Sequence, residues 1–207
     1  MPPIKRIQGR AVPIRGRDID TDRIVPARFL KTVTFDRLGE ALFYDERYDE
    51  KKNPKDHPLN DPRFAGARIM LVEAGFGSGS SREHAPQAIK RAGFEALVGE
   101  SFAEIFFGNA TQIGLVAVTV APEDLGYLFA LVERAPETEL VIDLEKMELK
   151  AGERVIPVFL PEAVREAFLE GRYDPLEVLL EAMDKIRAMD ARRAGPGKQG
   201  EYGGGGQ

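Results

Sequence analysis

The chain of 207 residues contains no cysteine. It therefore cannot form a disulfide or use a thiol as a nucleophile. It also cannot hold an iron–sulfur cluster or a structural zinc ion through thiolates of its own. Any redox metal that takes part in the activity of this protein must therefore be held by another chain.

The sequence also lacks an excess of basic residues and any long hydrophobic run. The 29 Lys and Arg residues are outnumbered by 34 Asp and Glu, which gives a net charge of −5. A nucleic-acid-binding surface would require the opposite balance. No run approaches the roughly 20 apolar residues of a membrane span, and residues 1–17 lack the apolar core of a signal peptide. We therefore expect a cytoplasmic protein that binds neither nucleic acid nor membrane.

The hydrophobic fraction of 43% and the length fit one substantial domain. In the middle of the chain, predicted strands at residues 68–74, 96–98 and 115–120 alternate with helical segments, a pattern typical of a parallel sheet. Residues 140–144 and 153–160 are predicted as antiparallel strands. The predicted fold is therefore α/β, with a mixed, partly parallel sheet, over residues 1–174.

Four further segments complete the expected organisation. Residues 9–15 are predicted as an edge strand or a pair of strands, because Pro13 interrupts the run. Residues 44–62 are polar and are expected to form a surface loop, with His57 solvated. Leucine, isoleucine and methionine recur every three or four positions in residues 175–193, which predicts a C-terminal amphipathic helix. The Gly-rich residues 194–207 are predicted to be a disordered tail.

The segment richest in functional side chains is a Gly/Ser-rich turn at residues 75–86. It follows a predicted buried strand and precedes a helix, a position where α/β proteins bind ligands against unpaired N–H groups. Its glycines, Gly79 among them, let the backbone approach an anion closely. Ser80 and Glu83 have the spacing of a capping box. Pro86 would lie in the second turn of a helix that began at Ser80, which favours a broken or two-step helix start.

Three familiar motifs do not fit this turn. No Gly-Lys-Ser/Thr follows, as a phosphate loop requires, and no serine has glycine two residues away on both sides, as in a nucleophile elbow. The third glycine of a dinucleotide fingerprint is also missing. From the residues alone, binding of a small carboxylate or phosphate and plain helix capping both remain open.

Three stretches resemble a known family: DTDRIVPARFLKTV (residues 20–33), GFGSGSSREHAPQAI (75–89) and SFAEIFFGN (101–109). They resemble the small subunits of isopropylmalate dehydratases, free-standing versions of the mobile C-terminal domain of the aconitase superfamily. The resemblance runs in order from residue 9 to about residue 187, and SSREHA is its most specific part. It implies a swivelling β/β/α domain.

The resemblance also implies roles for residues of the turn. Ser80 would be the general base, and Arg82 would clamp a substrate carboxylate with its planar guanidinium fork. A serine can act as a base only if its alkoxide is stabilised, which a helix N-terminus and an adjacent guanidinium can provide. Ser81 would hydrogen-bond a substrate carboxylate, or else cap the helix. By the same resemblance, Asp22 would orient an arginine or the cluster-bound hydroxyl. The alternative is that Asp20 or Asp22 forms an Asx turn or a helix cap. A histidine one turn into a helix is expected to be packed, so His84 is not expected to be catalytic.

A second group, Phe29, Leu30, Lys31 and Thr32, matches the loop that in relatives faces the variable part of the substrate. Phe29 and Leu30 could form an apolar wall for an isopropyl group. Lys31 could reach a carboxylate or point to water. The alternative is that the loop's apolar residues merely anchor it.

The implied activity is the interconversion of 2-isopropylmalate and 3-isopropylmalate by dehydration and rehydration, in leucine biosynthesis. The implied partner is a large subunit, in a heterodimer or heterotetramer, which holds a [4Fe–4S] cluster and most of the site for a small dicarboxylate. This chain itself would bind no metal and would be active only with that partner. The alternatives are the small subunit of a homoaconitase or related hydro-lyase, and a non-catalytic anion-binding module.

Overall fold

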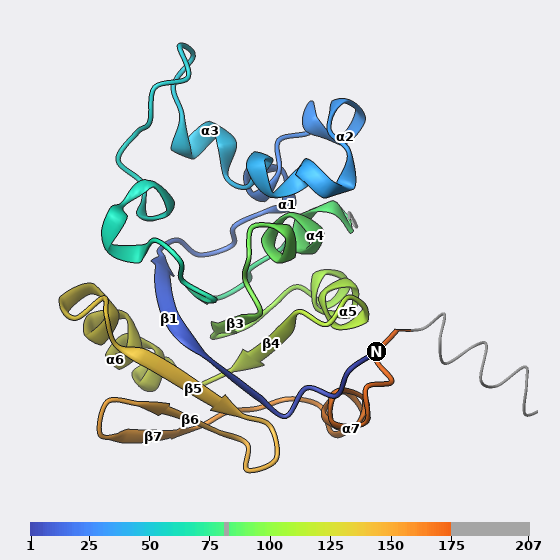
Figure 1. The fold of residues 1–207 in the computed structure, drawn as a ribbon, viewed down its shortest axis with the longest axis vertical. Coiled ribbons are helices and arrows are strands. Elements are labelled where there is room, and N and C mark those ends of the chain that lie inside the picture. The colour runs from blue at the N-terminus through green and yellow to red at the C-terminus, as the bar shows by residue number, and fades with distance from the viewer. Residues whose placement is uncertain (81–82, 175–207) are drawn as a thin grey trace, which may run out of the picture. The chain divides into compact units, whose positions relative to one another are not determined.

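The computed structural model describes residues 1–80 and 83–174, and the predicted C-terminal helix and tail lie outside the described residues. In the described part, seven strands form one sheet (Figure 1). In spatial order they are β4 (Val116–Thr119), β3 (Ala96–Gly99), β2 (Ile69–Val72), β1 (Arg6–Ile14), β5 (Glu139–Asp143), β6 (Glu148–Ala151) and β7 (Arg154–Pro157).

The sheet is parallel on one side of β1 and antiparallel on the other. Residues 11–14 of β1 run parallel to β2, and β3 and β4 continue that parallel half. Residues 6–10 of β1 pair antiparallel with β5, from which β6 and β7 follow as hairpins. The predicted α/β class with a mixed, partly parallel sheet is confirmed. The sequence interpretation missed β6, which lies between the two antiparallel strands that it did predict.

The predicted edge position of β1 is wrong, because β1 lies in the centre of the sheet. The amide of Arg68 donates to the carbonyl of Arg10 on the β2 side of the strand, at 3.0 Å. Since backbone groups alternate in direction along a strand, the nitrogen of Pro13 faces the other side. Pairing with β5 has already ended there, at Arg10. The missing N–H of Pro13 therefore costs no hydrogen bond with β5.

Buried apolar side chains explain the layers above and below the sheet. All four residues of β2 are 0% exposed, as expected of a strand covered on both faces. Helix α6 (Pro122–Arg134) contacts β1 and β2, whereas α4 (His84–Arg91) contacts α5 (Glu104–Gln112) and the 3₁₀ helix Phe35–Ala41. Helix α7 (Glu162–Glu170) ends at Gly171, whose φ of 71° lies in the left-handed region.

Short helices fill the chain between β1 and β2. They are α1 (Thr21–Ile24), α2 (Phe29–Thr32), the 3₁₀ helix and α3 (Tyr44–Arg47), and Figure 1 shows them gathered beyond the end of β1. The segment expected to be a surface loop, residues 44–62, thus contains α3 and the 3₁₀ turn Pro58–Asn60, and a further 3₁₀ turn, Pro62–Phe64, begins at its end. In the described part of the chain, no helix is long and apolar enough to cross a membrane.

Candidate active site

The Gly-rich turn follows β2 directly and lies between two other segments of the chain. Parallel bridges join Ser78 to Asp20 and Phe76 to Phe102. Residues 18–21 therefore lie on one side of the turn and residues 101–103 on the other. These are parts of the three stretches that carry the family resemblance, and the fold brings them together at the carboxyl end of β2, where α/β sheets bind ligands.

On the first side, backbone hydrogen bonds alternate between the turn and residues 18–21. Asp18 N–H donates to the carbonyl of Ala74 and Gly77 N–H to that of Ile19, both at 2.8 Å. Thr21 N–H donates to the carbonyl of Ser78 at 2.9 Å. This ladder extends the strand pairing into the turn and fixes its path.

On the second side, Ser101 and Ala103 hold the beginning of the turn. Gly75 N–H donates to Ser101 Oγ at 2.8 Å, and Phe76 N–H donates to the Ser101 carbonyl at 3.3 Å. Ala103 N–H donates back to the carbonyl of Phe76 at 2.9 Å. The ring of Phe76 is fully buried and meets Phe106 edge-on, with 5.3 Å between ring centres. The first half of the turn is therefore anchored in the core.

The second half of the turn, Gly79 and Ser80, is exposed. Helix α4 begins at His84, so Pro86 falls in its first turn. The broken or two-step start stays a prediction, because residues 81 and 82 lie outside the described part of the chain. Glu83 is the N-cap residue, and its side chain makes no capping hydrogen bond. The capping box expected between Ser80 and Glu83 is therefore not formed. Ser81 and Arg82 lie outside the described residues.

The ring of His84 stacks on that of Phe35, with centroids 5.1 Å apart and the planes 18° apart. His84 is half-buried. The ring is therefore packed, and the expectation that His84 is not catalytic stays a prediction.

The acidic residues before α1 have different positions. Asp20 is the N-cap of α1, and its carboxylate accepts from the amide of Arg23 at 2.8 Å. Asp22 lies exposed in the first turn of α1, next to the Thr21 that bonds to Ser78. Asp20 is therefore the helix cap, and the role of Asp22 in the site stays a prediction.

Phe29 and Leu30 of α2 are half-buried and Lys31 is exposed, while the side chain of Thr32 lies outside what the structure describes. The ring of Phe29 packs against Tyr44 at 4.9 Å, and the guanidinium of Arg28 covers it at 4.7 Å. Arg28 also donates to Asp45 on α3, at 2.9 Å. The described contacts that fix α2 thus come from α3 rather than from the Gly-rich turn. One part of the Phe29 ring is therefore packed against α3, and Lys31 is exposed to solvent.

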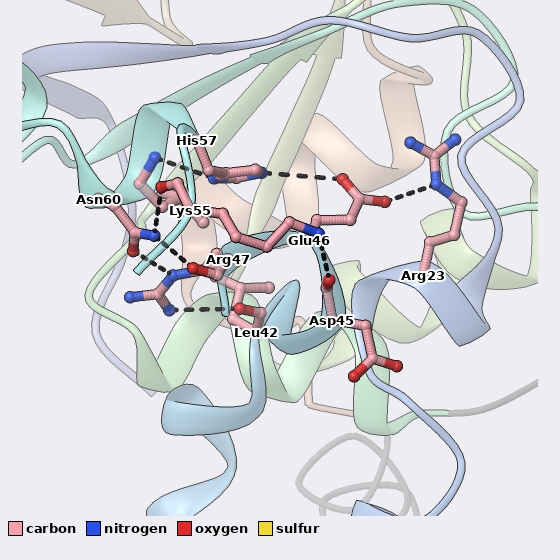
Figure 2. A network of polar contacts seen from close by, with 9 residues as sticks. Arg23, Leu42, Asp45, Glu46, Arg47, Lys55, His57 and Asn60 are labelled. Atoms are coloured by element: carbon pink, nitrogen blue, oxygen red, sulfur yellow. Dashed lines mark hydrogen bonds and ion pairs between the residues drawn. The ribbon is translucent and has the colours of Figure 1, made fainter. Parts of the chain in front are cut away.

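The expectation that His57 is solvated is wrong, since its side chain is only 9% exposed. Its Nδ1 accepts from the amide of Leu59 at 3.1 Å, and its ring packs on that of the buried Phe43. Figure 2 shows Glu46 between His57 and Arg23. The Glu46 carboxylate lies 3.8 Å from His57 Nε2 and 2.7 Å from Arg23 Nε. Burial lowers the pKa of His57 below its ordinary value.

Two residues at this site were given no role by sequence reasoning. Thr21 is 2% exposed, and its hydroxyl donates to the carbonyl of Ser80 at 3.2 Å. Glu46 pairs with Arg23 at the end of α1. Thr21 stood within the recognised stretch, but its role requires knowing that residues 18–21 lie beside the turn. Glu46 lies in a segment whose polarity suggested only a loop.

The described residues contain no group of three or more His, Cys, Asp or Glu side chains that could hold a metal ion. The whole sequence has no cysteine. The chain's own donors therefore do not fit an iron–sulfur cluster, which is held by cysteine thiolates.

The fold and the Gly-rich turn correspond to a domain of the aconitase type: the aconitase C-terminal domain family matches residues 1–123. A 3-isopropylmalate dehydratase small subunit from Thermus thermophilus is 64% identical over 186 residues, covering 90% of this chain and 92% of that protein. A protein of the same name from Synechocystis is 42% identical over 188 residues, covering 91% and 92%. This chain belongs to the aconitase C-terminal domain family, in the group of 3-isopropylmalate dehydratase small subunits.

A solved structure agrees with this assignment. The crystal structure of a 3-isopropylmalate dehydratase from Methanocaldococcus jannaschii matches with a TM-score of 0.61 and 28% identity. The match covers 86% of this chain and 99% of that one. The family resemblance drawn from the three sequence stretches is thereby confirmed.

Proposed function

We propose that this chain is the small subunit of a 3-isopropylmalate dehydratase, a hydro-lyase. Together with a large subunit it interconverts 2-isopropylmalate and 3-isopropylmalate by removing and re-adding water, in leucine biosynthesis. The observation that carries this function is the 64% identity, over nine tenths of the chain, with the Thermus thermophilus small subunit. The meeting of the three recognised stretches around one exposed turn supports it.

Within this reaction we assign Ser80 as the general base. The C–H bond next to a substrate carboxylate breaks, its proton goes to the Ser80 alkoxide, and its electron pair forms a C=C bond as the hydroxyl group leaves the neighbouring carbon as hydroxide. The cluster of the large subunit would supply the Lewis acid for that hydroxide. Rehydration adds hydroxide to the carbon that lost the proton and returns the proton from Ser80 to the carbon that lost the hydroxyl group. Ser80 lies exposed at the end of an anchored turn, and α4 begins four residues later in the sequence, at His84. The free N–H groups at the beginning of a helix favour negative charge nearby.

We assign Arg82 and Ser81 to the substrate carboxylate. The planar fork of an arginine can form two parallel hydrogen bonds to a carboxylate, and its charge also favours the serine alkoxide. Asp22 would orient the guanidinium of Arg82 or a hydroxyl group of the substrate. Its place in the first turn of α1, next to the Thr21 that bonds to the Ser80 carbonyl, supports this role.

We assign α2 to the variable group of the substrate, with Gly79 allowing close approach of the backbone. Phe29 and Leu30 offer apolar surface for an isopropyl group, since both are only half-buried. Lys31 is exposed, and its ammonium group could bind a further carboxylate of the substrate or point to water. Thr32 completes the segment that the family resemblance assigns to this contact.

We further propose that the large subunit holds the [4Fe–4S] cluster. The absence of cysteine from this chain supports that division, because the cluster needs thiolate ligands. We propose a heterodimer or a heterotetramer as the active assembly, with a small dicarboxylate as substrate. A cytoplasmic location remains a prediction.

Reconstitution tests the proposed function. The purified chain alone should be folded, colourless and without hydro-lyase activity, and adding a cluster-loaded large subunit should produce isopropylmalate conversion. Iron bound stoichiometrically to the pure chain would contradict this division of labour. A complex that converts homoaconitate but not isopropylmalate would identify the related hydro-lyase. A complex whose activity does not depend on this chain would favour a non-catalytic anion-binding module.

A further inference from the structure

Thr21 is one of only two buried polar residues in the described part of the chain, the other being His57. Its backbone amide donates to the carbonyl of Ser78 at 2.9 Å. Its hydroxyl donates to the carbonyl of Ser80 at 3.2 Å. One residue therefore holds the chain on both sides of Gly79.

Gly79 is the place in the turn where such a hold matters. Its φ of 100° is a conformation that other residues rarely adopt. Because glycine has no Cβ, many other backbone conformations are open to it, so contacts elsewhere must hold it at this φ. The bonds to Ser101 and Ala103 act on Gly75 and Phe76, at the start of the turn. Beyond Ser78, the described bond that reaches Ser80 is the one from Thr21.

Thr21 can fix the turn because α1 is itself held firmly. The carboxylate of Asp20 caps its first turn, and Phe43 N–H donates to the carbonyl of Ile24 at 2.8 Å. At the end of α1, Arg23 pairs with Glu46, which also faces the buried His57 (Figure 2). The side chain of Ile24 is fully buried. The Thr21 hydroxyl therefore projects from a short but anchored element.

We propose that Thr21 is a positioning residue, whose hydroxyl fixes the backbone of Ser80 and so aims the Ser80 side chain at its substrate. The inference rests on the proposed function in taking Ser80 as the proton acceptor. Thr21 does not touch the substrate in this scheme. The Thr21 hydrogen bond restricts the backbone of Ser80 in advance, so less conformational entropy is lost when Ser80 reaches the geometry for proton transfer.

The test compares Thr21→Val, which keeps the shape but loses the hydroxyl, with Thr21→Ser, which keeps the hydroxyl. Thr111→Val is the matched control, because it removes a threonine hydroxyl that bonds to Phe107 within α5. In the complex with the large subunit, Thr21→Val should lower kcat by roughly tenfold or more with little change in KM, since small misplacements of a reacting group are costly. Thr21→Ser should restore most of kcat, and Thr111→Val should leave it unchanged.

Hydrogen exchange on the isolated chain supplies a readout that does not depend on activity. Amides of residues 75–84 should exchange faster in Thr21→Val than in wild type, and Thr21→Ser should resemble wild type. Thr21→Ala takes the place of Thr21→Val if circular dichroism shows that the valine variant does not fold. Equal exchange and equal kcat for the variants with and without the hydroxyl would overturn the proposal. An inactive wild-type complex would instead contradict the proposed function, and hydrogen exchange would still decide the role of Thr21.

Discussion

The backbone of Gly77 lies against the ring of Phe106. A Cβ built on Gly77 would come within 2.2 Å of Phe106 Cγ, and the φ of Gly77 is 86°. Phe106 in turn packs edge-on against the buried Phe76. The shape of the Gly-rich turn is therefore set by the aromatic core beneath it as well as by its hydrogen bonds.

Gly77→Ala is expected to destabilise the protein by about 1–3 kcal/mol, because alanine is strained at this φ and its methyl group meets an aromatic ring. It should also lower the activity of the complex, since the turn must shift. Urea unfolding of the isolated chain measures the first effect. Gly126→Ala, in α6 with open space around its Cβ, is the matched control and should stabilise by about 0.5–1 kcal/mol. A Gly77→Ala variant as stable as wild type would contradict this view of the turn.

The pKa of His57 predicts a pH dependence of stability. Burial holds this pKa below its ordinary value of 6.5, so the unfolded chain binds the proton more readily than the folded chain. The free energy of unfolding should therefore be greatest above the unfolded pKa. It should fall as the pH drops below 6.5 and level off once the folded pKa has been passed.

His57→Asn keeps an acceptor near the Leu59 amide and cannot be protonated. Between about pH 7.5 and about pH 5.5, wild type should lose more unfolding free energy than this variant. His84 is present in both proteins, so its contribution cancels. Equal losses in urea unfolding would show that His57 titrates as it does in an unfolded chain.

The sequence predicted the α/β class because its strand signals are strong. The apolar run at residues 68–74 contains the fully buried β2. The central position of β1 was beyond sequence reasoning, because the cost of Pro13 depends on which neighbours pair with each half of the strand. The burial of His57 depends similarly on tertiary contact, with Phe43 and Glu46.

The candidate site was predicted in part. The turn at residues 75–80 follows from the glycine and serine positions, and its place before α4 follows from the predicted helix. The hydrogen bonds from Thr21 and Ser101 do not, because they join residues that are distant in sequence. Local patterns identify which residue types are present, whereas the fold decides which of them meet.

Arg82→Lys is expected to raise KM for isopropylmalate markedly, because lysine keeps the charge but loses the two-pronged geometry for a carboxylate. A fall in kcat as well would indicate that Arg82 also stabilises the serine alkoxide. Arg63→Lys, an exposed arginine paired with Asp61, is the control and should leave both constants unchanged. An unchanged KM for Arg82→Lys would remove Arg82 from the carboxylate site.

The central claim is that Ser80 of this chain takes the substrate proton. The most direct measurement is steady-state isopropylmalate conversion by the reconstituted complex with wild-type chain, with Ser80→Ala and with Ser78→Ala, each checked for folding by circular dichroism. Ser80→Ala should lower kcat by several orders of magnitude with little change in KM, because the lost interaction exists mainly in the transition state. Ser78→Ala, which removes a hydroxyl bonded to the Asp18 carbonyl, should keep most of the activity. Near wild-type kcat for Ser80→Ala in a folded complex would contradict the assignment and shift it to Ser81 or His84.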